Sequence, residues 1–60
     1  MNVDIEYALL MTKRMETDLK FLKKQEKPLD VDNNSEHRDS FTQVRTCINH
    51  LDEMFQEFNF

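Results

Sequence analysis

The 60-residue sequence predicts an all-α fold, an antiparallel two-helix hairpin, and three observations lead to it. Large apolar residues recur at alternating steps of three and four in both halves of the chain, which places them on one side of a helix. The sequence has no glycine, so the tight turns of β-hairpins are missing. Pro28 lies between the periodic halves among turn-forming residues. We therefore expect one domain over residues 1–60, with helices over 2–25 and 35–58 and a loop over 26–34.

The first expected helix, residues 2–25, has both a start signal and a stop signal. Asn2 can cap its N-terminus, and acidic residues in its first turn suit the positive end of the helix dipole. Lysines occupy its last turns, where cations favour the negative end. A small residue and a polar residue within its apolar stripe allow another helix to approach closely. The stripe consists of Met1, Ile5, Ala8, Thr12, Met15, Leu19 and Leu22.

A second apolar set on this helix falls toward another side and includes Tyr7, Leu10 and Phe21. One interpretation is that these side chains are partly exposed and cover the edge of the main stripe, since apolar atoms are common on protein surfaces. The other is that they form a second contact face for a partner. The sequence leaves both interpretations open.

The expected loop, residues 26–34, is rich in Asp, Asn and Pro, which favour turns. Leu29 and Val31 are expected to fold back and plug the end of the core. Carboxylates alternate at Asp30 and Asp32, but the glycine and the later glutamate of a calcium-binding loop are missing. We therefore expect no calcium site in this segment.

The second expected helix, residues 35–58, carries the strongest apolar pattern in the chain. Asn33 followed by Glu36 resembles a capping box, with Asn34 or Ser35 as neighbouring starts. Asp39 or Ser40 would cap a later start. The apolar stripe is wider than a two-helix seam needs and suits the core of a bundle. It contains Phe41, Val44, Ile48, Leu51, Phe55 and Phe58, widened on one side by Cys47 and Met54.

A short loop folds the two helices back on each other as antiparallel neighbours. Lysines at the end of the first helix are then expected beside acids at the start of the second. Each exposed pair of this kind contributes about 0–1 kcal/mol. The residues concerned are Lys20, Lys23 and Lys24, with Glu36 and Asp39.

The sequence offers little for catalysis or metal binding. Cys47 and His50 lie on one helical side and His37 is expected ahead of the helix, but a structural zinc site takes four ligands. Cys47 is better interpreted as a small buried hydrophobe and His50 as a surface residue. No glycine-rich turn is present to form an oxyanion hole or a phosphate loop. We expect a non-enzymatic protein without a metal, a cofactor or a small-molecule substrate.

The size of the chain indicates that it needs a companion. A chain this short buries only about 60% of the surface that it exposes when unfolded. One cysteine cannot form an internal disulfide, so oligomerisation or a partner protein is the remaining means of stabilisation. No run of apolar residues is long enough to span a membrane, and the acidic N-terminus is no signal peptide. A cytoplasmic location is expected.

These features predict a protein–protein interaction module, such as a small adaptor, an assembly subunit, a co-chaperone or an inhibitory regulator. An amphipathic helix face would bind another protein or a second copy of the chain and complete a four-helix-type bundle. The expected contact residues are Phe41, Ile48, Leu51, Met54, Phe55 and Phe58, with Leu10 and Phe21 as outward candidates.

An alternative is a homodimeric RNA-binding hairpin that uses the basic side of the first helix. Lys13, Lys20 and Lys24 are its candidate contacts. Residues 28–60 contain two basic and seven acidic residues, which disfavours a nucleic-acid surface in that half. Nucleic-acid binding is therefore the second hypothesis.

Overall fold

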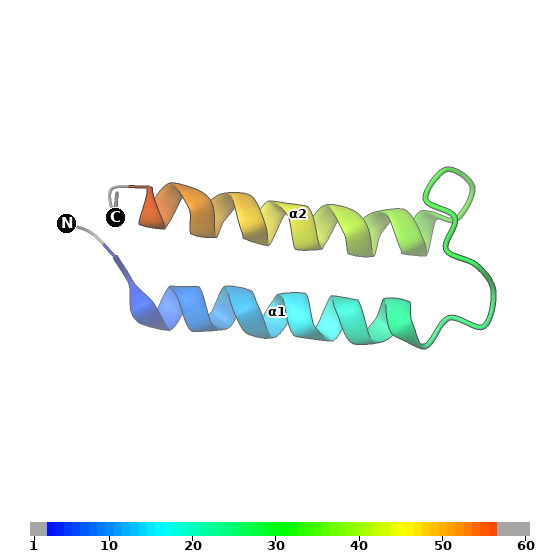
Figure 1. Cartoon of the computed structure of the whole chain (residues 1–60), viewed down its shortest axis with the longest axis horizontal. Coiled ribbons are helices and arrows are strands. Elements are labelled where there is room, and N and C mark those ends of the chain that lie inside the picture. Colours follow the sequence, from blue (N-terminus) through cyan, green and yellow to red (C-terminus); the bar gives the residue numbers. More distant parts are fainter. Residues whose placement is uncertain (1–2, 57–60) are drawn as a thin grey trace.

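A computed structural model describes residues 3–56 of the chain. Within this range the chain forms two helices and no strand: α1 (Ile5–Lys23) and α2 (Ser35–Phe55). The helices lie side by side and run antiparallel, with one loop joining them (Figure 1). The predicted all-α two-helix packing is therefore confirmed, whereas completion of a four-helix bundle stays a prediction.

The start of α1 is fixed by a side-chain cap. The Asp4 carboxylate accepts a hydrogen bond from the backbone N–H of Tyr7 at 3.1 Å and satisfies one of the first exposed N–H groups of the helix. The helix begins at Ile5 with Asp4 as its N-cap, which corrects the expected start at residue 2; the predicted cap, Asn2, lies outside the described residues. At the other end α1 stops at Lys23, because Gln25 turns back and its Nε2 donates to the carbonyl of Phe21 at 3.0 Å.

The start of α2 depends on Asn34. Its side-chain oxygen accepts from the backbone N–H groups of Glu36 and His37, at 3.0 and 3.1 Å. Asn33 is not the cap, because its backbone N–H and its side-chain amide both donate to the carboxylate of Asp30. His37 lies in the first turn of α2 and not ahead of the helix as expected. The described part of α2 ends at Phe55, so the predicted end at residue 58 lies outside the described residues.

The core is a narrow seam between the helices. Its residues recur at steps of three and four on both helices, a spacing that keeps them on the side of each helix that faces the other helix. Only Met11, Leu22 and Cys47 are fully buried hydrophobic residues within the described range, and His37 is buried with them. The seam consists of Ala8, Met11, Met15, Asp18 and Leu22 on α1, Gln25 just after α1, and His37, Ser40, Val44, Cys47, Leu51 and Met54 on α2.

The seam and the stripe that the sequence predicts on α2 share one row, Val44 and Leu51, and differ in the other row by one residue. Cys47 is 1% exposed, whereas Ile48 is 52% exposed. Helix α1 shows the same displacement, because Met11 is buried while Thr12 and its heptad neighbours are exposed. Two sets of positions on each helix have the same spacing, and spacing alone does not decide which set faces the other helix.

Candidate interaction surface

One side of the seam, which we call the polar flank, is closed by side-chain pairs between the helices. The Tyr7 hydroxyl and His50 Nδ1 lie 3.0 Å apart in a hydrogen bond whose direction depends on the imidazole tautomer. With its amide oxygen turned toward Arg14, Gln43 accepts from the guanidinium Nε and Nη2 at 3.1 Å. Tyr7 and Arg14 are seven residues apart, as are Gln43 and His50. These cross-helix pairs hold the rotation of each helix about its axis.

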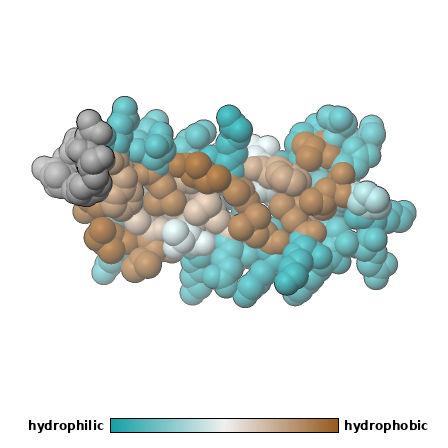
Figure 2. Space-filling view, in the orientation of Figure 1, coloured by the Kyte–Doolittle hydropathy of each residue, from teal (hydrophilic) through white to brown (hydrophobic). Residues whose placement is uncertain are grey.

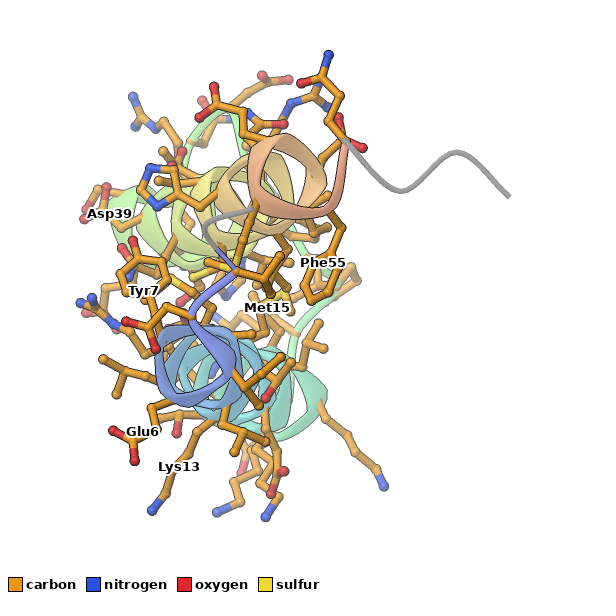
Figure 3. All side chains as sticks on the ribbon, turned by 90° about the vertical axis from the view of Figure 1, so that its left-hand side faces the viewer. Glu6, Tyr7, Lys13, Met15, Asp39 and Phe55 are labelled. Carbon is orange, nitrogen blue, oxygen red and sulfur yellow. The ribbon has the colours of Figure 1, made fainter. Side chains whose placement is uncertain are left out.

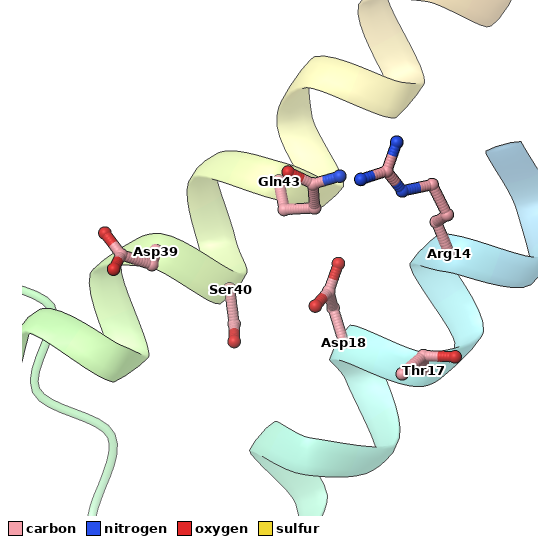
Figure 4. Close-up of a pocket in the computed structure, with 6 residues that line it drawn as sticks. All are labelled: Arg14, Thr17, Asp18, Asp39, Ser40 and Gln43. Atoms are coloured by element: carbon pink, nitrogen blue, oxygen red, sulfur yellow. The ribbon is translucent and has the colours of Figure 1, made fainter.

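A shallow polar hollow lies on the same flank (Figure 4). Asp18 lies within it, half-buried at a seam position. Its Oδ2 atom is buried and finds no hydrogen-bond partner in the described part of the chain. A buried acceptor without a donor is destabilising, so the seam contains a polar residue that weakens it. The hollow is lined by Arg14, Thr17, Asp18, Asp39, Ser40 and Gln43.

The other side of the seam, which we call the apolar flank, has the opposite character. On each helix a seven-residue repeat lies beside the seam, at positions 5, 12 and 19 and at positions 41, 48 and 55, and all of these residues except Thr12 are large and apolar. Hydrophobic side chains gather along the line between the two helices on the face that Figure 2 shows. The apolar flank consists of Ile5, Leu9 and Leu19 on α1, Phe41, Ile48 and Phe55 on α2, and Val31 in the loop, all of them exposed.

Two apolar hollows indicate how these residues are arranged. One lies on α1 and is lined by Thr12, Met15 and Leu19, with Glu16, Lys20 and Lys23 at its edge. The other lies on α2 and includes Val31, Phe41, Val44 and Ile48, with Arg45 among the polar residues around them. An end view places Tyr7 and Phe55 on opposite sides of the hairpin (Figure 3).

Thr12 is the polar member of the α1 row between Ile5 and Leu19. Its hydroxyl donates to the backbone carbonyl of Leu9 at 2.8 Å. Because that donor is satisfied within the helix, covering Thr12 with a partner leaves no unsatisfied hydroxyl proton. The row is therefore compatible with burial along its whole length.

The residues predicted as contacts separate into three groups. Phe41, Ile48 and Phe55 lie on the apolar flank, whereas Leu51 and Met54 are half-buried in the seam. Phe21 is half-buried and borders a hollow on the polar side with Glu36 and Asp39. Leu10 is exposed and lies in the same helical row as Phe21, on the polar-flank side of α1. Phe58 lies outside the described residues.

The sequence did not identify Ile5, Leu9, Leu19 and Val31 as contact residues. Ile5 and Leu19 were expected to face the other helix, and both are exposed. Val31 and Leu29 were expected to plug the core, but they are exposed as well. The signal that identifies the flank is a seven-residue repeat on each helix, at positions 5, 12 and 19 on α1 and at positions 41, 48 and 55 on α2. This repeat runs alongside the residues that form the seam.

The basic residues of α1 are exposed and mixed with acids. The Lys20 ammonium lies 2.9 Å from the Glu16 carboxylate, one turn earlier on the same helix. This hydrogen bond and its charge attraction lower the pKa of Glu16 and raise the pKa of Lys20. The expected ion pairs of Lys20, Lys23 and Lys24 with Glu36 or Asp39 do not occur among the described residues, and Lys20 pairs with Glu16 within α1 instead.

His37 connects three segments near the loop and is 2% exposed. Its Nδ1 accepts from the backbone N–H of Asp30 at 3.0 Å. Since Nδ1 is the acceptor, the neutral imidazole carries its proton on Nε2, which donates to the Gln25 side-chain oxygen at 3.0 Å. The imidazole therefore joins α2 to the loop and to the residue just after α1.

No cluster of three potential metal-ligating side chains occurs among residues 3–56. Neither α1 nor α2, as far as the structure describes them, is long and apolar enough to cross a membrane. Comparison of the chain with families of known proteins, with curated proteins and with solved structures finds no match.

Proposed function

We propose that this chain is a non-enzymatic protein–protein interaction module that binds through the apolar flank. The observation that carries the proposal is the exposure of large apolar residues in two heptad-spaced rows on one side of the hairpin. Contiguous apolar patches of this kind mark interaction sites on soluble proteins. Fully burying one such side chain is worth about 1.5–3 kcal/mol, and these side chains are roughly half covered already. Covering them would contribute about 1 kcal/mol each.

The contrast between the flanks supports the same function. Polar pairs between the helices close the polar flank, at Tyr7 with His50 and at Arg14 with Gln43. The apolar flank shows large apolar residues on both helices and two apolar hollows. An adaptor, an assembly subunit, a co-chaperone and an inhibitory regulator would all use such a surface in the same way.

RNA binding, the alternative, has weaker support. Phosphate binding needs clustered basic residues. Lys13 projects from the side of α1 that also presents Glu6 (Figure 3), and Lys20 is paired with Glu16. Lys24 is exposed at the end of α1. The basic residues are thus interspersed with carboxylates.

A matched pair of leucines on α1 tests the proposal. Leu19 on the apolar flank is 53% exposed, and Leu10 on the polar-flank side of the same helix is 52% exposed. Leu19→Lys should abolish binding to the proteins captured with the tagged chain, whereas Leu10→Lys should leave it unchanged. Binding should also persist in high salt, because apolar burial is not screened. Equal effects of the two substitutions would refute the proposal.

The same preparation tests the alternative. Binding to RNA that falls steeply with salt and is lost when Lys13, Lys20 and Lys24 are replaced by Ala would favour the RNA-binding hairpin. Unchanged behaviour of this triple variant, together with loss of protein binding in Leu19→Lys, would favour the interaction module.

A further inference from the structure

We infer that the occupant of the apolar flank is a second copy of this chain, which forms a two-fold symmetric four-helix bundle with the first. This inference rests on the proposed function, since it names the partner for the same surface. It follows from the width of the flank, its area, its charges and the composition of the seam that it adjoins.

The flank is two helices wide. Its rows lie on adjacent helices, whose axes in packed pairs are about 8–10 Å apart. Each row extends over fifteen residues, from Ile5 to Leu19 and from Phe41 to Phe55, or roughly 21 Å along the helix. One docked helix would cover the line between the rows and leave their outer edges in water. A second hairpin presents two rows of the same length and spacing, and a copy of this chain is such a hairpin.

The area of the flank suits a stable dimer. Seven large apolar side chains remain between 38% and 63% exposed. At about 100 Å² for each half-exposed side chain, they present on the order of 700 Å². A standard specific interface buries about 800 Å² on each partner. Two copies meeting through this flank would therefore reach the size of an ordinary specific interface.

The charges beside the flank do not repel a copy. Although the chain has a net charge of −4, the rim positions next to the two rows hold four basic and two acidic residues. Most acids lie elsewhere on the hairpin. A copy that meets the flank therefore encounters both signs of charge and not one repulsive field. The rim residues are Glu16, Lys20, Lys23, Arg38, Arg45 and Asp52.

The flank is continuous with the seam inside the hairpin. Met15 and Val44 belong to the seam and also line the apolar hollows. A second hairpin would extend the small core outward from these residues and form one contiguous apolar interior. Symmetric dimers are the commonest oligomers of soluble proteins, and such an interface uses the same patch on both copies.

Sedimentation equilibrium of the purified full chain tests the inference. The mass should rise from 7.3 kDa toward twice that value with concentration, and circular dichroism should report helix throughout. Leu19→Lys should weaken the dimer at least ~10-fold, because a charge replaces an apolar contact in each copy. Leu10→Lys, with nearly the same exposure on the same helix, should leave the dissociation constant within about twofold.

Two results would overturn the inference, and neither depends on a variant that must fold. The first is a helical wild-type chain that remains monomeric up to the highest soluble concentration. The second is a dimer that Leu19→Lys leaves intact and Leu10→Lys weakens. If the chain is monomeric but Leu19→Lys still abolishes capture of another protein, the second copy is excluded and the proposed function stands. If Leu19→Lys and Leu10→Lys act alike on both measurements, both proposals fail.

Discussion

Replacing His37 should destabilise the hairpin more than any other single polar substitution, because this imidazole joins three segments. His37→Ala removes the acceptor for the Asp30 N–H and the donor for the Gln25 oxygen. Two net hydrogen bonds are worth about 1–3 kcal/mol, and the vacated volume of a side chain that is 2% exposed adds to this. We expect a loss of about 2–4 kcal/mol, a large share of the stability of a small domain.

Two conservative variants separate the contributions of the two His37 hydrogen bonds to the free energy of unfolding. In His37→Asn the side-chain oxygen can replace Nδ1 and keep the Asp30 bond, whereas in His37→Gln the amide nitrogen can replace Nε2 and keep the Gln25 bond. Each variant should lose less free energy of unfolding than His37→Ala. The free energy of unfolding is measured by urea titration followed by circular dichroism, with exposed His50→Ala as the control. A loss below about 0.5 kcal/mol in His37→Ala would refute the reasoning.

Three further outcomes follow from other contacts. Asp18→Leu should raise the free energy of unfolding by about 1 kcal/mol, because it removes a buried oxygen that lacks a partner. A free energy of unfolding below that of the wild-type chain would contradict this reasoning. Hydrogen bonds from the side chain and backbone of Asn33 hold the pKa of Asp30 below its ordinary value. The stabilisation is therefore complete above the unfolded-state pKa and is lost as pH falls through the folded-state pKa, so Asp30→Asn should flatten the acid limb of the stability profile. Tyr7→Phe should lower stability by no more than about 1 kcal/mol, because its bond to His50 is exposed; a larger loss in urea unfolding would contradict this.

The sequence predicts the two helices and their packing because both depend on local rules. Apolar residues at steps of three and four require a helix wherever they occur, and the loop contains the only proline of the chain. The ends of the helices are harder to predict, because several residues can act as caps. Asp4 and Asn34 act as caps, although Asn2 and Asn33 are also suitable residue types.

The rotation of each helix could not be predicted from spacing, and the apolar flank depends on it. On α2 the sets that contain Cys47 and Ile48 are both helical stripes, offset by one residue. Long-range hydrogen bonds join Gln25 with His37 and Tyr7 with His50, and they accompany the observed rotation of the two helices. Such pairs join residues far apart in the sequence, so no local pattern reveals them.

The composition of the seam is itself an argument for a companion. Asp18, Gln25 and Ser40 occupy seam positions, while Ile48 and Phe41 stay exposed one residue away. A hairpin adapted to stand alone would place its larger apolar residues in the seam, because burying them contributes most to stability. A seam that contains polar residues beside an apolar flank is instead the arrangement expected when the flank is buried by association. In the proposed assembly the polar pairs would fix how each helix is rotated, and association would supply the apolar burial that the hairpin lacks.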